Sequence, residues 1–135
     1  MKKITIFALV LVSLFLSGGS FAQELNDWEQ NVYCDYLDTF YSTKGDYNAL
    51  MAKIAIRHGI SVDQLEDIED KALDKKITDW EWKVAEELTA RLNNLPKGSS
   101  WAVRKEIFKE IAAKYKLSLC QLYDIDNRCM AYWLW

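Results

Sequence analysis

The tetrapeptide Asn26-Asp27-Trp28-Glu29, followed by Val32, returns later in the chain as Thr78-Asp79-Trp80-Glu81, followed by Val84. In each copy a short polar side chain stands three residues before a carboxylate. This spacing is typical of a capping box, which satisfies the free amides at the start of a helix. The repeat therefore marks two equivalent helix starts and predicts two related helical units.

A second pair of matched segments lies further along the chain. Residues 54–68 and 111–125 agree at several positions, and each contains a serine followed three residues later by a glutamine, which repeats the capping pattern. Gly59 fits a left-handed helix end, and Lys116 stands at the matching position. The first pair of segments is offset by 52 residues and the second by 57. The second unit therefore contains an insertion of about one helical turn.

Apolar residues recur at helical spacing through most of the chain, and no stretch alternates convincingly with a period of two. The predicted helices cover residues 26–41, 47–58, 61–74, 78–93, 100–115 and 118–130. We therefore predict an all-α fold made of a tandem duplication of a three-helix unit, with units at 23–76 and 77–135. About 50 residues bury little surface alone, so we expect the two units to pack as one compact domain.

Residues 1–22 have the pattern of a secretory signal peptide. Two lysines precede an apolar run over residues 4–16, and the small residues Ser20 and Ala22 suit cleavage before Gln23. The run is shorter than the roughly 18 residues that a membrane-spanning helix needs. We therefore expect a bacterial protein that is periplasmic or secreted, with no stable membrane insertion after cleavage.

Export would place Cys34, Cys120 and Cys129 in an oxidising compartment, where cysteines that meet form disulfides. Cys120 and Cys129 would lie about 13 Å apart along one helix, which is too far for a bond. Cys34 is therefore the expected partner of any intrachain bridge, with either Cys120 or Cys129. We prefer Cys129, because Cys120 lies in the start of the last predicted helix.

Charge argues against a nucleic-acid partner. The chain has a formal charge of -3. Residues 54–65 resemble the corner of a helix-turn-helix motif, as does the matching segment of the second unit. The helix that follows residues 54–65 carries several acidic residues, which phosphates would repel. We therefore expect a structural corner. Residues 23–76 are acidic and residues 77–135 slightly basic, which favours electrostatic attraction between the units.

The sequence contains little that could support catalysis. His58 is the only histidine, so neither a multi-histidine zinc site nor a Ser-His-Asp relay with a spare histidine can form. It aligns with Tyr115, which indicates a structural role at the corner. The acidic residues from Asp63 to Asp74 do not match a calcium loop, and we expect them to form the solvated outer face of a helix. The capping position of Glu81 explains that carboxylate. We therefore expect no catalytic residue, no metal and no cofactor.

Tryptophan is frequent, with six in the chain. Trp28 and Trp80 occupy matched positions and are expected in the core or at its boundary. Several other aromatic residues have no counterpart in the opposite unit, and a C-terminal tail this apolar should either fold back onto the helices or dock a partner. The candidate binding residues are Trp101, Tyr132, Trp133 and Trp135.

These features favour a non-enzymatic protein-interaction module. We expect it to bind an envelope or extracellular protein through the aromatic tail or through the groove between the units. The alternative is a protein that binds a glycan or cell-wall fragment, possibly a small hydrolase. A hydrolase would need a convergent pair of acids in a cleft. No motif in the sequence identifies the partner or sets the oligomeric state.

Overall fold

The computed structural model describes residues 24–134, which form six helices and no strand. The helices are α2 (Asp27–Ser42), α3 (Tyr47–His58), α4 (Val62–Leu73), α5 (Asp79–Asn93), α6 (Trp101–Lys114) and α7 (Leu119–Leu134). The predicted all-α class is confirmed. The last helix runs beyond its predicted end at residue 130, so residues 131–134 continue α7 instead of forming a separate tail. The predicted signal peptide, residues 1–22, and Trp135 lie outside the described residues.

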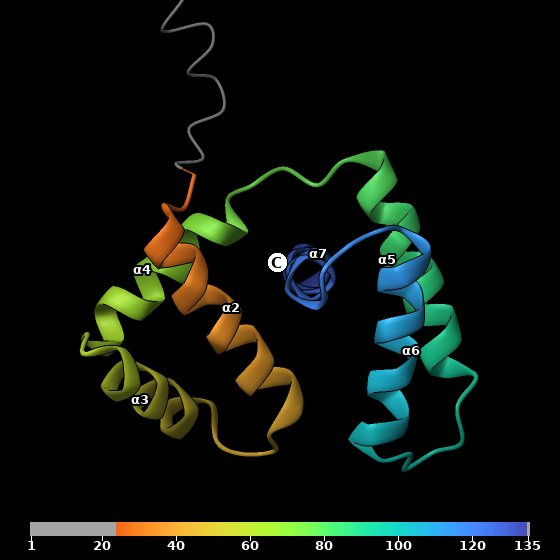
Figure 1. Cartoon of the computed structure of the whole chain (residues 1–135), viewed down its shortest axis with the longest axis horizontal. Coiled ribbons are helices and arrows are strands. Elements are labelled where there is room, and N and C mark those ends of the chain that lie inside the picture. The colour runs from red at the N-terminus through yellow and green to blue at the C-terminus, as the bar shows by residue number, and fades with distance from the viewer. Residues whose placement is uncertain (1–23, 135) are drawn as a thin grey trace, which may run out of the picture.

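Helix α7 lies between the two halves of the molecule (Figure 1). It packs against α2 and α4 on one side and against α5 and α6 on the other. Helices α2, α3 and α4 also pack on one another, as do α5 and α6. The second half therefore supplies the helix around which both halves assemble.

The predicted caps form where the sequence places them. The Asn26 side chain accepts a hydrogen bond from the Glu29 backbone N–H at 2.8 Å, and the Glu29 carboxylate accepts one from the Asn26 N–H at 3.2 Å. Reciprocal pairs of the same kind join Thr78 with Glu81, Ser61 with Gln64, and Ser118 with Gln121. Four helices therefore begin at a satisfied amide end, as predicted.

The two helix corners share an unusual backbone conformation. Gly59 ends α3 with a φ of 66°, in the left-handed region that glycine adopts freely. Lys116, at the matching position after α6, has a φ of 55°. A residue with a side chain loses roughly 1–2 kcal/mol in this conformation. The corner geometry is therefore the same in both halves although only one of them has a glycine.

Ion pairs also occupy equivalent positions in the two halves. Lys71 Nζ lies 2.8 Å from Glu29 Oε2, and the Arg128 guanidinium pairs with Glu81. The offsets of 52 and 57 that align the sequence repeats also align these partners. A second matched set joins Arg57 and His58 to Asp35, and Lys114 and Tyr115 to Glu87. These correspondences support the tandem duplication, which stays a prediction.

The interface between the halves is aromatic. The rings of Tyr41 and Tyr123 stack with centroids 4.6 Å apart, and the Tyr41 hydroxyl donates to Asp126 Oδ2 at 2.5 Å. Phe108 and Trp101 pack around the same rings. Every ion pair found within residues 24–134 joins side chains of one half. The expected electrostatic attraction between the units therefore does not take the form of ion pairs among these residues and stays a prediction.

The disulfide joins Cys34 to Cys120, whose Cα atoms lie 5.4 Å apart, so the preference for Cys129 was wrong. The bond does connect α2 to α7, as expected. Nine residues of helix are two and a half turns, which puts Cys120 and Cys129 on opposite faces of α7. Cys120 faces α2, whereas Cys129 is buried against Ala85 and Ile125.

Non-reducing peptide mapping should show Cys34 linked to Cys120 and Cys129 free. Burial raises the pKa of Cys129 to about 11, so alkylation at neutral pH should be slow until the protein unfolds. The double variant Cys34→Ser/Cys120→Ser should lower the free energy of unfolding by about 2–4 kcal/mol. A bond between Cys34 and Cys129, or rapid labelling of Cys129 in the folded protein, would contradict this arrangement.

The two matched ion pairs differ in burial, which gives a second test. The Arg128 side chain is 2% exposed and the Lys71 side chain 36%. Arg128→Met leaves the Glu81 carboxylate buried without its partner and should cost about 3 kcal/mol or more in urea unfolding. The carboxylates of Glu29 and Glu81 are about equally covered, at 12% and 11% exposed, so the pairs differ in the burial of the cation. Lys71→Met should cost less, about 1 kcal/mol, because a cation that is partly in water gains less from pairing. Equal losses would show that burial does not separate the pairs.

Candidate functional site

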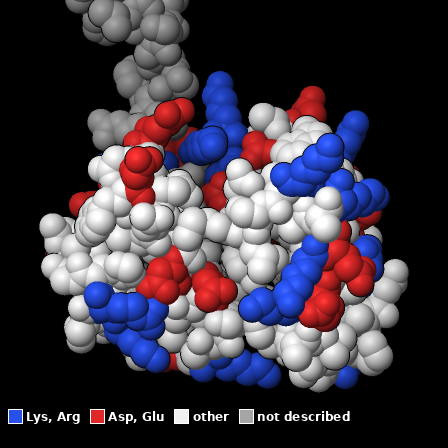
Figure 2. Space-filling model, viewed as in Figure 1, with Lys and Arg blue, Asp and Glu red and all other residues white. Residues whose placement is uncertain are grey.

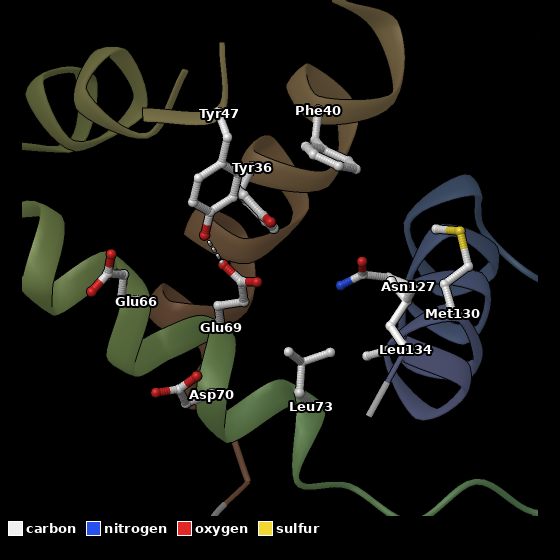
Figure 3. Close-up of a pocket in the computed structure, with 11 residues that line it drawn as sticks. Tyr36, Phe40, Tyr47, Glu66, Glu69, Asp70, Leu73, Asn127, Met130 and Leu134 are labelled. Atoms are coloured by element: carbon white, nitrogen blue, oxygen red, sulfur yellow. Dashed lines mark hydrogen bonds between the residues drawn. The ribbon is translucent and has the colours of Figure 1, made fainter. Parts of the chain in front are cut away.

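An open groove lies between α4 and α7 and encloses about 580 Å³. Figure 3 shows its side chains. It is lined from α4 by Glu66, Glu69, Asp70 and Leu73, from α7 by Asn127, Met130, Ala131 and Leu134, and from α2 and α3 by Tyr36, Phe40 and Tyr47. The residues of α4 and α7 recur at intervals of three and four, so each helix presents one face to the groove. We call this the α4–α7 groove.

Glu69 is the central polar residue of the groove. The Tyr47 hydroxyl donates to Glu69 Oε2 at 3.1 Å. In Figure 3 the Glu69 carboxylate points toward the hydroxyl groups of Tyr36 and Tyr47, while Glu66 and Asp70 lie on the side of α4 away from α7. Burial raises the pKa of Glu69, hydrogen bonds from the two tyrosines lower it in part, and the nearby carboxylates of Asp70 and Glu66 raise it.

The α7 side of the groove is apolar. Met130 is 40% exposed and Leu134 is 82% exposed, and Phe40 adds an exposed ring from α2. The Phe40 ring stacks on Tyr36 with centroids 5.9 Å apart. The groove therefore has an acidic aromatic end beside α4 and an aliphatic wall on α7. An uncovered apolar wall of this kind makes the groove a candidate binding surface.

The charges on the lining have one sign. Among the described residues, the groove is lined by three acidic residues and by no basic residue. Figure 2 shows lysine and arginine side chains over α5 and α6, where acidic side chains accompany them, and a further group at the lower left over α3. The groove thus offers a negative environment to a ligand.

The structure places Tyr132 and Trp133 on the last turn of α7. Their rings pack edge to face against Trp82, with centroid distances of 5.3 and 6.1 Å. Trp133 is nevertheless 78% exposed. This aromatic corner of Trp82, Tyr132 and Trp133 lies beside α5. Residues of the same α7 turn, Met130 and Leu134, line the groove.

The remaining predicted aromatic residues do not join this corner. Trp101, at the start of α6, packs against Phe108 and Tyr123 in the interface between the halves, and its Nε1 atom is buried without a hydrogen-bond partner. Trp135 lies outside the described residues. Trp28 and Trp80 are about half exposed, so they lie at the boundary and not in the core.

The groove residues were not predicted as a site. The acids of α4 were interpreted as a solvated helix face, and Met130 was placed at the end of its helix. The useful signal was the spacing of Met130 and Leu134, which continues the apolar pattern of α7 by one turn. Their juxtaposition with Glu69 depends on the packing of α7 against α4.

Within residues 24–134, no group of three histidine, cysteine or acidic side chains converges as a metal site. No helix in this part of the chain is long and apolar enough to cross a membrane. His58 binds Asp35 through Nε2 at 2.7 Å and does not line the groove, so it joins the end of α3, at the corner between α3 and α4, to α2.

Comparison with protein families, curated proteins and solved structures finds no match to this chain. A function for the α4–α7 groove must therefore be argued from its own geometry.

The ionisation of Glu69 should be visible in the pH dependence of stability. The pKa of Glu69 is raised in the folded protein. The uncharged Glu69 side chain therefore stabilises the fold below the ordinary glutamate pKa, and this stabilisation is lost as the pH rises through the raised pKa. Glu69→Gln cannot ionise. The free energy of unfolding of Glu69→Gln should therefore increase relative to that of the wild type as the pH rises from about 4.

Urea unfolding at a series of pH values measures this difference. Asp67→Asn, in an exposed residue of the same helix outside the groove, controls for the loss of one negative charge. A difference between Glu69→Gln and wild type that does not change with pH would show that Glu69 ionises normally.

Proposed function

We propose that this chain is an exported, non-enzymatic protein-interaction module that binds a partner protein in the α4–α7 groove. The observation that carries the proposal is the uncovered apolar wall of Met130 and Leu134 opposite the α4 face. Its residues contribute little to the buried core, so their exposure is not explained by folding. Interfaces in which a helix lies in an apolar groove use surfaces of this kind.

The proposal of export rests on two observations. The first 22 residues have the pattern of a signal peptide. The disulfide between Cys34 and Cys120 is compatible with an oxidising compartment. Both support a periplasmic or secreted location.

The non-enzymatic role is favoured by how the polar side chains are used. Glu81 caps α5 and pairs with Arg128, and His58 is held by Asp35. Burial alone would raise the pKa of Glu81, but the bonds from Arg128 and Thr78 keep it below its ordinary value. A carboxylate held in this way suits structure better than proton transfer.

Site-specific photo-crosslinking in the organism of origin tests the binding surface. A benzoylphenylalanine at Leu134 should give one protein adduct of defined mass. The matched control is Ile56, which is 81% exposed on α3 and does not line the groove. The adduct should be absent there, and Leu134→Asp should remove an adduct formed from Phe40.

Two results would contradict this assignment. Equal adduct patterns from Leu134 and Ile56 would show unspecific contact. A protein adduct from Trp133 alone would move the binding surface to the aromatic corner. Capture of a glycan at Trp133, with no protein adduct at Leu134, would support the alternative of a glycan-binding or cell-wall-fragment-binding protein.

A further inference from the structure

We infer that the occupant of the α4–α7 groove is a basic amphipathic helix of the partner protein, with a lysine or arginine placed at Glu69 and apolar residues on the α7 wall. This inference rests on the proposed function and specifies the chemistry of the partner. It follows from an equivalence between α4 and α7, from the charge of the lining and from its aromatic rings.

The groove face of α4 corresponds to the face with which α7 binds a helix. At the repeat offset of 57 residues, Glu66, Glu69 and Asp70 align with Tyr123, Asp126 and Asn127. Those three residues of α7 all contact α2. Tyr123 and Asp126 bind Tyr41, and Asn127 Nδ2 donates to the Tyr33 hydroxyl at 3.3 Å. The groove face of α4 is therefore at the position with which α7 binds a helix of the other half.

The substitutions between the two faces specify the charge of the missing helix. Where α7 has one acidic residue among these positions, α4 has three. Helix α2, which occupies the α7 face, has acidic residues and no lysine or arginine. The same helix from a second copy would therefore be repelled by α4. A helix with lysine or arginine is the complement of this face.

The aromatic residues beside Glu69 favour a cation as well. Tyr36, Phe40 and Tyr47 border the polar end of the groove, and ring faces attract an ammonium or guanidinium group. A cation at Glu69 would also offset the burial that disfavours its carboxylate. The aliphatic wall of Met130 and Leu134 lies across the groove, where the apolar stripe of an amphipathic helix would pack.

Titration with three designed peptides tests this inference on the disulfide-bonded mature chain. Each peptide has about 18 residues, or five helical turns, with leucine on one face and either lysine, glutamine or glutamate on the other. Isothermal titration should show that the lysine peptide binds at least about tenfold more tightly than the glutamine peptide. The glutamate peptide should show no binding.

Variants locate the bound cation. Glu69→Gln should weaken the lysine peptide about tenfold, the effect of losing one charge-assisted hydrogen bond. Asp67→Asn, which removes the same charge from the exposed side of α4, should weaken it less than about twofold. Circular dichroism of both variants before titration establishes that they are folded.

The outcomes separate this inference from the proposed function. Equal affinity for the lysine and glutamine peptides, or equal effects of the two variants, would overturn the cationic occupant and leave an apolar groove that still binds protein. If none of the peptides binds, the inference of a cationic helix is also overturned. The crosslinked adduct at Leu134 then tests independently whether the groove binds a protein. Concentration-dependent dimerisation that Leu134→Asp abolishes would identify a second copy as the occupant and overturn the inference.

Discussion

The structure depends on α7 being buried on two faces at once. One face packs on α5 through Ile125 and Cys129, and another packs on α2 through Tyr123, whose ring stacks on Tyr41. A helix in this position cannot carry a charged outer stripe over most of its length, because a buried ion without a partner is strongly destabilising. Arg128 meets this constraint by binding two carboxylates and the Lys76 carbonyl oxygen.

The burial of α7 on two faces also explains which aligned positions of the two halves carry different residues. Positions that face the half's own core keep similar residues, as in Leu65 with Leu122 and Ile68 with Ile125, all of which are buried. Positions on the face that α7 turns toward α2 differ between the halves, and Glu66 of α4 aligns there with Tyr123 of α7. In α7 that face meets α2, so an aromatic ring is favourable there. In α4 it meets the groove, so a carboxylate remains hydrated.

Local features of the fold could be predicted because their causes are local. The capping boxes, the left-handed turn at Gly59 and the apolar spacing each involve residues within one or two helical turns, and they placed the helices correctly. The choice between Cys120 and Cys129 required knowing which face of α7 meets α2. The Tyr41 contacts with Tyr123 and Asp126, more than 80 residues away in sequence, leave no periodic signal. The groove was missed for the same reason, since α4 and α7 are brought together only by packing.

The groove is a consequence of packing two groups of helices around one central helix. Where α7 lies between the halves, α2 covers one of its faces, but within residues 24–134 the corresponding face of α4 stays open to the groove. Apolar residues on both walls of the groove would leave a large exposed patch, whereas charged residues on both walls would leave no apolar surface for a helix to bury. The observed lining is intermediate, because the Glu69 carboxylate lies on the groove side of α4 and aliphatic side chains line the groove from α7. Such a lining stays hydrated when empty and would accept a helix of opposite charge, which is the physical basis for proposing binding at the groove.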